Sequence, residues 1–284
     1  MANYRKILVA FDGSSDSRNA LRQALRLAEA EGCWIKVLAV APSYEGDLEL
    51  VGVRDIGGVV RGAAEGLLRE AEDLARAERG SIMTGLEQGE AYERIVEVAK
   101  AENCDLIMMG RRGQHRLERM LMGTVTAMVI GHSPIDVLVV PGGAELGWKN
   151  ILACTDGSKY SESATERALN HVKARGGRVT VLSVVFVNDE FYALSPGAVE
   201  SLIEKSWQRL EKIQKKAEGL GVEADFLVRD GEPHQRIIEV AGDRGADVIF
   251  MGSHGRTGLR KLLMGSVTEK VVGLADCPVL IVKG

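Results

Sequence analysis

Apolar residues along the chain fall into short unbroken runs that alternate with longer amphipathic stretches. The run at 6–11 is apolar, and in the stretch that follows, 14–31, apolar residues recur every three or four positions. The first pattern predicts a buried strand and the second a helix with one buried face. Ser14 or Ser15 is a suitable N-cap, because a serine oxygen can accept a backbone N–H of the first helical turn.

The same alternation continues to the end of the chain. The first half predicts further strands at 34–40, 81–87, 105–109 and 135–140, and helices at 59–79, 91–101 and 124–131. The second half predicts strands at 150–155, 178–185, 223–228, 247–251 and 278–282, and helices at 161–174, 198–219, 233–244 and 266–274. Strands that are apolar throughout and separated by helices are typical of a parallel sheet covered on both faces. We therefore predict an α/β fold with a doubly wound, five-stranded parallel sheet in each half.

The two halves of the chain repeat each other. The segments 105–110 and 121–126 reappear as 247–252 and 263–268, in both cases 142 positions later (from 105 to 247 and from 121 to 263). A breaker-rich stretch at 141–147 separates the copies. We predict two tandem domains, 1–143 and 148–284. We also expect them to pack across their apolar closing strands as an intrachain pseudo-dimer, since such an edge must be covered. Whether the chain also forms a homodimer stays open.

A glycine-rich segment follows the fourth predicted strand in each half. The spacing is Gly-x2-Gly-x9-Gly-(Ser/Thr) both times, formed by Gly110, Gly113, Gly123 and Thr124 in the first half and by Gly252, Gly255, Gly265 and Ser266 in the second. Glycines let the backbone approach an anion, and a helix N-terminus presents free amides to phosphate oxygens. The alternative is that the glycines only shape a turn and a helix cap. The identical spacing in two copies favours phosphate binding.

Basic residues crowd the same two segments. They are Arg111, Arg112, Arg116 and Arg119 in the first half and Arg256, Arg260 and Lys261 in the second. In a chain that is acidic overall, this local reversal of charge fits a polyphosphate. Neither segment is a Walker A loop, because no Gly-Lys-(Ser/Thr) follows, and no Gly-x-Gly-x2-Gly opens the first helix.

An Asp-Gly-Ser triplet follows the first strand of each half. Asp12 and Asp156 therefore stand at the carboxyl edge of their sheets, where doubly wound folds bind ligands. A carboxylate there can accept hydrogen bonds from ribose hydroxyls or hold a magnesium ion near phosphates. Ordinary helix capping is the other interpretation, and the two are compatible.

Catalytic patterns are missing from the sequence. No Gly-x-Ser-x-Gly elbow occurs, and no nucleophile stands beside a candidate base. We expect His115, His132, His171 and His234 at the surface or in loops, and His254 to contribute charge within the second glycine segment. The sequence therefore predicts neither catalytic residues nor protein ligands dedicated to a metal.

Composition narrows the remaining classes. The 284 residues are 45% hydrophobic and 27% charged, which excludes a disordered chain, and the formal net charge of −4 argues against nucleic acid and anionic membranes as partners. The four cysteines show no paired metal-binding spacing and are typical of reduced thiols. No apolar run approaches the roughly 20 residues of a membrane span, and the amino terminus lacks a signal-peptide pattern. We expect a cytoplasmic protein.

These motifs together give a resemblance to a known family. The chain resembles a tandem member of the universal stress protein (Usp) family, in its ATP-binding branch, over essentially its whole length. The paired glycine segments, the Asp-Gly-Ser triplets and the (Val/Ile)-x-Met-Gly strand before each glycine segment carry the resemblance. It implies a Rossmann-like, adenine-nucleotide alpha hydrolase-like fold. It also implies a stress-response regulatory or sensor module that binds ATP, ADP or AMP, with or without magnesium.

The resemblance also assigns roles to individual positions. Ribose contacts are implied for Asp12 and Asp156. Phosphate contacts are implied for Gly110, Gly113, Gly123, Thr124 and Thr126 in the first half and for Gly252, Gly255, Gly265, Ser266 and Thr268 in the second. Their neighbours Met109, Val125, Met251 and Val267 are implied to line the nucleotide site, without a role of their own. Those implied around adenine are Ala10, Phe11 and Val40 in the first half and Cys154, Thr155 and Val184 in the second. Phe11 stands where the family often has a small or hydroxyl residue, which favours the second site.

Two other functions stay open from the sequence alone. A slow ATP hydrolase would use the same sites, with Asp12 or Asp156 positioning magnesium. A structural or interaction protein would retain glycine segments that no longer bind a ligand. The protein partner that a regulatory module would act on is not identified by any motif.

Overall fold

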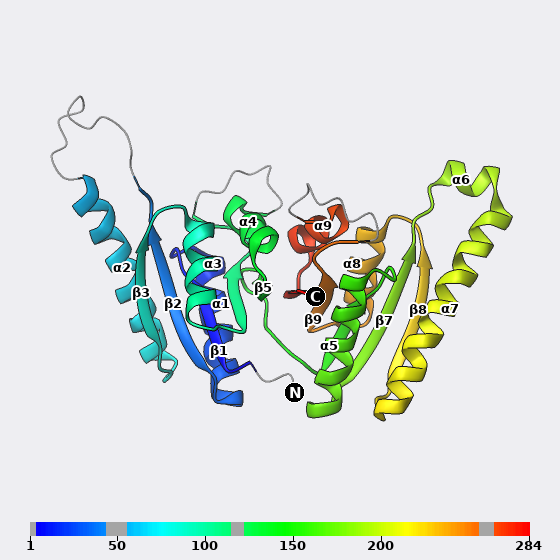
Figure 1. The fold of residues 1–284 in the computed structure, drawn as a ribbon, viewed down its shortest axis with the longest axis horizontal. Helices are drawn as coiled ribbons and strands as arrows, with labels where there is room; N and C mark the ends of the chain where they lie inside the picture. The colour runs from blue at the N-terminus through cyan, green and yellow to red at the C-terminus, as the bar shows by residue number, and fades with distance from the viewer. Residues whose placement is uncertain (1–3, 44–55, 115–121, 256–263) are drawn as a thin grey trace. The chain divides into compact units, whose positions relative to one another are not determined.

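A computed structural model of the chain describes residues 4–43, 56–114, 122–255 and 264–284. The chain divides into two compact units, of which the first ends at Ala144 and the second begins at Glu145. We call them the N-terminal unit and the C-terminal unit and treat each by itself. Figure 1 follows the chain through both units in colour, from blue at the N-terminus to red at the C-terminus.

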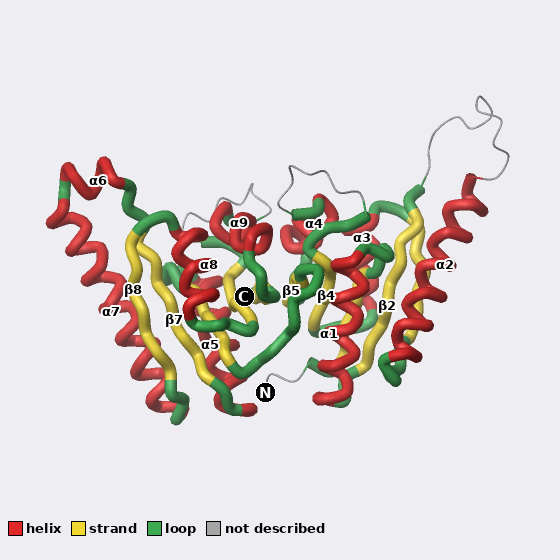
Figure 2. The backbone as a smooth tube through the Cα atoms, turned by 180° about the vertical axis from the view of Figure 1, so that it is seen from behind, coloured by secondary structure: helices red, strands yellow, loops and turns green. Residues whose placement is uncertain are grey.

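The N-terminal unit is a parallel sheet in the strand order β3-β2-β1-β4-β5. Helix α1 packs beside α2, and α3 packs beside α4, so that a helix pair covers each face of the sheet (Figures 1 and 2). The elements are β1 (Lys6–Ala10), α1 (Ser15–Glu31), β2 (Trp34–Ala41), α2 (Ile56–Ala77), β3 (Met83–Gln88), α3 (Ala91–Ala101), β4 (Leu106–Gly110), α4 (Thr124–His132) and β5 (Asp136–Val140).

The C-terminal unit repeats this plan in the order β10-β9-β6-β7-β8, again with parallel pairing. Helix α5 packs beside α7, and α8 packs beside α9. The elements are β6 (Asn150–Cys154), α5 (Lys159–Arg175), β7 (Arg178–Val185), α6 (Asp189–Leu194), α7 (Pro196–Leu220), β8 (Ala224–Asp230), α8 (Pro233–Asp243), β9 (Val248–Gly252), α9 (Ser266–Leu274) and β10 (Val279–Val282). The predicted fold class, two tandem doubly wound parallel sheets, is confirmed.

Burial on both faces explains why the central strands are apolar throughout. Val9 of β1 pairs with Val37 on one side and Met108 on the other, and all three side chains are fully buried. Within the part of the chain that the structure describes, no helix combines the length and the apolar character needed to cross a membrane.

The strand order fixes where a ligand can enter. In the N-terminal unit β1 lies between β2 and β4, so the chain winds outward from β1 in both directions. Helices therefore leave the carboxyl ends of β1 and β4 toward opposite faces, and a crevice opens between them. The same switch lies between β6 and β9. Each Asp-Gly-Ser triplet is thereby brought next to the glycine segment of its own unit.

The predicted elements recur with small shifts at their ends. Helix α3 and strand β7 have the predicted bounds, whereas α2 begins three residues earlier than predicted. The short helix α6 was missed because six residues are too few to show a helical period. Of the two serines predicted as N-cap of α1, Ser14 has this role, since its Oγ accepts the Ser17 amide at 3.1 Å.

The prediction for His171 is wrong. Its side chain is 3% exposed and lies on the buried face of α5, with its ring centroid 5.0 Å from that of Trp148. Among the described residues no hydrogen-bond partner is found for its Nε2 atom. Burial, and to a lesser extent the charge of Arg175, lowers the pKa of His171 from 6.5 to about 4.

This buried histidine predicts acid sensitivity of the C-terminal unit. Between pH 6.5 and 4 the unfolded chain binds a proton that the folded unit excludes, so the free energy of unfolding falls as the pH falls. We expect the wild type to lose about 2 kcal/mol more stability than His171→Phe between pH 7 and pH 5. Urea unfolding of both proteins at the two pH values measures this difference. An equal loss in both would contradict the assignment.

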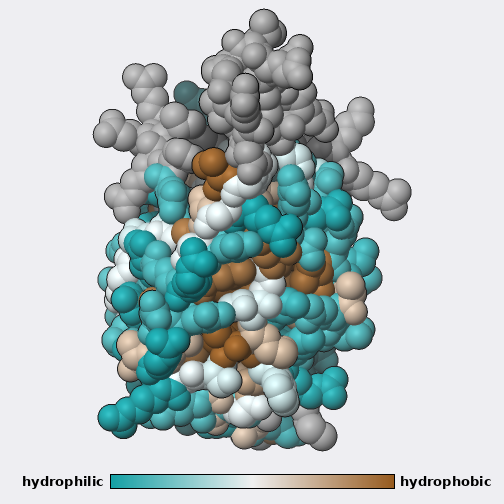
Figure 3. Space-filling model, turned by 90° about the vertical axis from the view of Figure 1, so that its left-hand side faces the viewer, coloured by the Kyte–Doolittle hydropathy of each residue, from teal (hydrophilic) through white to brown (hydrophobic). Residues whose placement is uncertain are grey.

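Strand β3 forms the outer edge of the N-terminal sheet. Its Met83 is 40% exposed, and the other apolar residue of the strand, Leu86, is half-buried. Figure 3, which faces this side, shows apolar surface in the middle of a polar rim. Glu87 and Gln88 end the strand with polar groups, a common protection of a sheet edge.

Candidate functional site

Each unit contains a cavity at the carboxyl ends of its strands. The volumes are about 430 Å³ in the N-terminal unit and about 480 Å³ in the C-terminal unit, within the range of small-molecule sites. Every residue to which the resemblance assigned a contact lines one of them. In the N-terminal cavity these are Ala10, Phe11, Asp12, Val40, Met109, Gly110, Gly113, Gly123, Thr124, Val125 and Thr126. In the C-terminal cavity they are Cys154, Thr155, Asp156, Val184, Met251, Gly252, Gly255, Gly265, Ser266, Val267 and Thr268.

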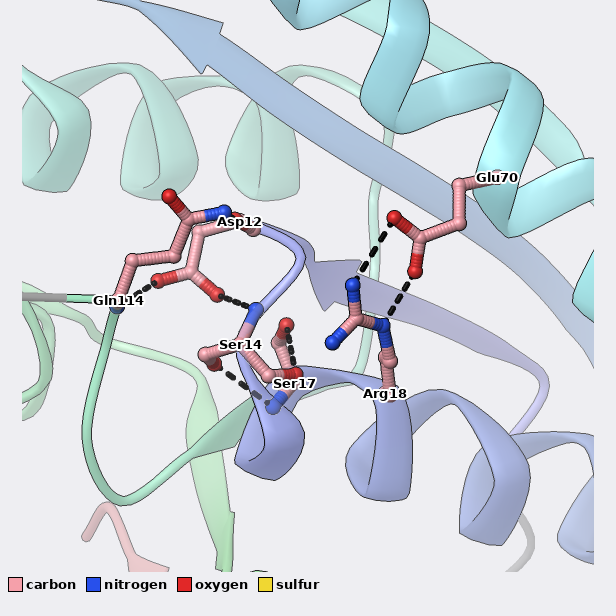
Figure 4. Close-up of polar contacts among 6 residues, drawn as sticks. All are labelled: Asp12, Ser14, Ser17, Arg18, Glu70 and Gln114. Carbon is pink, nitrogen blue, oxygen red and sulfur yellow. Dashed lines mark hydrogen bonds and ion pairs between the residues drawn. The ribbon is translucent and has the colours of Figure 1, made fainter.

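The turn after β1 places a carboxylate at the N-terminal cavity (Figure 4). Asp12 accepts the Ser14 amide at 3.0 Å through Oδ1 and the Gln114 amide at 3.2 Å through Oδ2. Gln114 in turn donates its side-chain amide to the Asp12 carbonyl. Arg18, one turn further along α1, forms an ion pair with Glu70 of α2. These contacts hold the Asp12 carboxylate against the glycine segment.

The turn after β6 is built in the same way. Asp156 accepts the Ser158 amide at 2.9 Å, and Ser158 caps α5 by accepting the Ser161 amide at 3.3 Å. The capping interpretation of the Asp-Gly-Ser triplets is therefore correct for the serine. The aspartate of the same turn lines the cavity.

Backbone hydrogen bonds close each glycine segment at its ends. The Gly123 amide donates to the Arg111 carbonyl at 2.9 Å, and the Gly265 amide donates to the Ser253 carbonyl at 3.0 Å. The buried hydroxyl of Thr126 donates to the Gly110 carbonyl at 3.0 Å. Thr268 does the same for Gly252 at 3.1 Å. These bonds fix the first turn of α4 and of α9 against the end of the preceding strand.

Packing within the unit requires a glycine at the first position of each segment but not at the third. A Cβ on Gly110 would lie 2.7 Å from the Asp16 Cβ, and one on Gly252 would lie 2.6 Å from the Tyr160 carbonyl carbon. Helix packing therefore excludes any side chain at these first glycines. Apart from its two chain neighbours, no atom of the described residues would lie closer than 3.5 Å to a Cβ on Gly265. Its φ of −68° also suits any residue.

The third glycines therefore leave exposed backbone beside a space that no side chain of the described residues fills. Gly123 and Gly265 are the N-caps of α4 and α9 and carry no capping side chain. Within the described residues, no acceptor is found for the amides of the next three residues in either helix. Those amides form the positive end of the helix dipole, and the residues that carry them line the two cavities. This arrangement can bind phosphate oxygens without a lysine.

Phe11 narrows the N-terminal cavity without closing it. Its side chain is 3% exposed, and its amide bonds the Leu38 carbonyl at 2.9 Å, as the Thr155 amide bonds Leu182 at 2.8 Å. The cavity beside Phe11 keeps about nine-tenths of the volume of the other (430 against 480 Å³). Size alone therefore does not separate the two sites.

The two glycine segments bring different side chains to their cavities. Arg112 lines the N-terminal cavity, and the matching position of the C-terminal cavity is His254. Cys154 is buried, which raises the pKa of its thiol and keeps it neutral. Of the other basic residues predicted for the loops, Arg111 lines a separate pocket beside α1. The remaining five, Arg116, Arg119, Arg256, Arg260 and Lys261, lie outside the described residues.

From the sequence we did not predict that α2 and α7 contribute side chains to the cavities. Leu67 of α2 lines the N-terminal cavity, and Leu202, Ser206 and Arg209 of α7 line the C-terminal one. These helices carry no recognisable motif. The repeat was a usable signal. Position 209 lies 142 residues after position 67, so Leu67 and Arg209 are equivalent positions of the two halves.

Comparisons with known proteins agree with this architecture. Residues 3–141 and 147–283 each match the Universal stress protein family. The universal stress protein MJ0531 of Methanocaldococcus jannaschii is 37% identical over 51% of this chain and 87% of its own length. A universal stress protein of Mycolicibacterium smegmatis is 25% identical over 98% of this chain and 96% of its own. The crystal structure of a universal stress protein from Archaeoglobus fulgidus has the same fold, with a TM-score of 0.73 at 24% identity over 98% of this chain and 96% of that one.

The two units are thus repeated α/β domains, each with a glycine-lined cavity at its topological switch point. The chain belongs to the universal stress protein family, with two family domains in tandem.

Proposed function

We propose that both cavities bind adenine nucleotides and that the chain acts as a nucleotide-binding regulatory module in the stress response. The observation that carries the proposal is the bare backbone at Gly123 and Gly265, which protein packing does not require. It lies beside free helix amides, where phosphate oxygens are favoured.

The rest of each cavity suits a nucleoside. Asp12 and Asp156 offer carboxylate oxygens to ribose hydroxyls at the first-strand turn. Val40 and Val184, at the ends of β2 and β7, are half-exposed and face the apolar side of the cavity together with Ile95 and Ile237. A flat aromatic base is a good fit for such an apolar slot.

Magnesium fits these residues only as a companion of the phosphates. Asp12 and Asp156 are the sole carboxylates among the described residues of their cavities. No group of three potential metal-ligating side chains occurs in the described part of the chain. A Mg²⁺ ion that arrives with ATP would be held by phosphate oxygens, water and one aspartate, and would shield the phosphate charge.

The direct test is to identify what the protein carries and binds. Purified full-length protein is denatured and any released nucleotide is identified by mass, and fresh protein is titrated calorimetrically with ATP, ADP and AMP. We expect binding at two sites per chain, and a ligand at 100 times its Kd to raise the free energy of unfolding by about 2.7 kcal/mol. The absence of released nucleotide, binding heat and thermal shift would refute the proposal. Phosphate release measured on the same sample separates binding from slow hydrolysis.

A further inference from the structure

The two cavities differ at one position where α2 and α7 approach the turn after the first strand of their units. Helices α2 and α7 align at the 142-residue repeat, because their buried positions coincide. These buried residues are Ala64, Leu68 and Ala75 on α2 and Ser206, Leu210 and Ala217 on α7. The alignment places Leu67 and Arg209 at equivalent points, and each lines the cavity of its own unit.

Arg209 is held over the Asp156 turn by three hydrogen bonds. Its Nη1 donates to the Asp156 carbonyl at 3.0 Å and its Nε to the Lys205 carbonyl at 3.0 Å. Its Nη2 donates to the Ser206 hydroxyl at 3.3 Å. These bonds use three of the five N–H groups of a guanidinium. A half-buried cation of fixed orientation therefore lines the cavity, and two of its N–H groups find no acceptor among the described residues.

Leu67 takes the equivalent position in the N-terminal unit, with an apolar side chain in place of a cation. A Cβ on Gly13 would lie 2.6 Å from the Leu67 Cδ2 atom, so the leucine packs directly on the Asp12 turn. The cation of that cavity, Arg112, instead belongs to the glycine segment, where its amide donates to Asp16 at 3.2 Å. One cavity thus has a guanidinium beside its aspartate, and the other has an apolar side chain.

We propose that Arg209 is a phosphate-binding residue that distinguishes the C-terminal site from the N-terminal site. The inference rests on the proposed function and adds a ligand group to it. The carboxylate of Asp156 is 2.9 Å from where a Cβ on Gly255 would lie, so Arg209, Asp156 and the glycine segment border one space. A guanidinium in that space binds a phosphoryl group near the ribose with charge-assisted hydrogen bonds.

Two phosphoryl groups share this chemistry, namely the first phosphate of a 5′ chain and a phosphate on the ribose itself. The experiment titrates the full-length protein calorimetrically with adenosine, 5′-AMP, 3′-AMP and ATP. Arg209→Leu installs the residue of the other repeat. We expect it to weaken one of the two sites about 10- to 100-fold for a phosphorylated ligand and to leave adenosine binding unchanged. The ligand whose affinity falls identifies the phosphoryl group.

Matched variants separate this role from packing. Arg209→Lys keeps the charge and should restore part of the affinity, whereas Arg209→Gln keeps polar contacts to the helix and should not. Leu67→Arg should strengthen binding of a phosphorylated ligand at the N-terminal site. An equal loss for adenosine and the nucleotides, or no loss at all, would overturn the inference. If the wild type binds no adenine nucleotide, the proposed function itself fails. That result is distinct from the two outcomes that would overturn only the inference about Arg209.

Discussion

Replacing Gly265 with valine is expected to abolish adenine-nucleotide binding in the C-terminal unit while the unit stays folded. A Cβ at this position meets only ordinary contacts, the nearest being the Gly255 amide nitrogen at 3.5 Å. Its branches then fill the space that the free amides of α9 would share with phosphate. We expect a loss of affinity of about 100-fold or more, equivalent to ~2.7 kcal/mol. The fold should lose only about 1 kcal/mol, because valine is a poor N-cap.

Calorimetric titration of the full chain checks this result. The wild type should bind two nucleotides per chain and Gly265→Val one. Gly123→Val is the matched variant in the other unit and should remove the second site in the same way. The assignment of the phosphate site is wrong if Gly265→Val still binds two nucleotides with wild-type affinity. Thermal unfolding without ligand confirms that each variant is folded.

The elements that the sequence predicts best are those whose pattern is local. Helix α3 and strand β7 show complete apolar periods, and their bounds agree with the structure. The glycine segments and Asp-Gly-Ser triplets are also local patterns, so the sequence alone is enough to recognise them. Strand order could be anticipated in general terms because a parallel sheet with helices on both faces has few windings.

Contacts made between distant segments were harder to predict. Arg209 reaches the Asp156 carbonyl across 53 positions, and nothing around it in the sequence indicates that reach. His171 shows a signal that was available and overlooked. It lies seven residues after Ala164 and three after Ala168, both fully buried, so the helical period alone places it on the buried face. The prediction followed the general tendency of histidines to lie at the surface and not the helical spacing of the buried residues.

Replacing Gly252 with valine is expected to have the opposite profile from Gly265→Val, because the first glycine of the segment serves packing. A Cβ on Gly252 would lie 2.6 Å from the Tyr160 carbonyl carbon and 2.8 Å from the Ser161 amide nitrogen. Both are backbone atoms at the start of α5, so relief requires the helix to move away from β9. Overpacking of this kind should lower the free energy of unfolding by about 3 kcal/mol.

Urea unfolding measures the effect, and Gly242→Ala in α8 supplies the control. Apart from its chain neighbours and its own helix backbone, no atom of the described residues lies within 4 Å of a Cβ at Gly242. Gly242 is the last residue but one of α8, so that variant should gain no more than about 0.5 kcal/mol. A Gly252→Val protein that unfolds at the wild-type urea concentration would show that α5 does not press on β9 as described. Nucleotide binding should fall in Gly252→Val only together with stability, because α5 carries Ser161 of the cavity wall with it. In Gly265→Val binding should fall without an equal loss of stability, since the third glycine borders the proposed phosphate site and the first packs against α5.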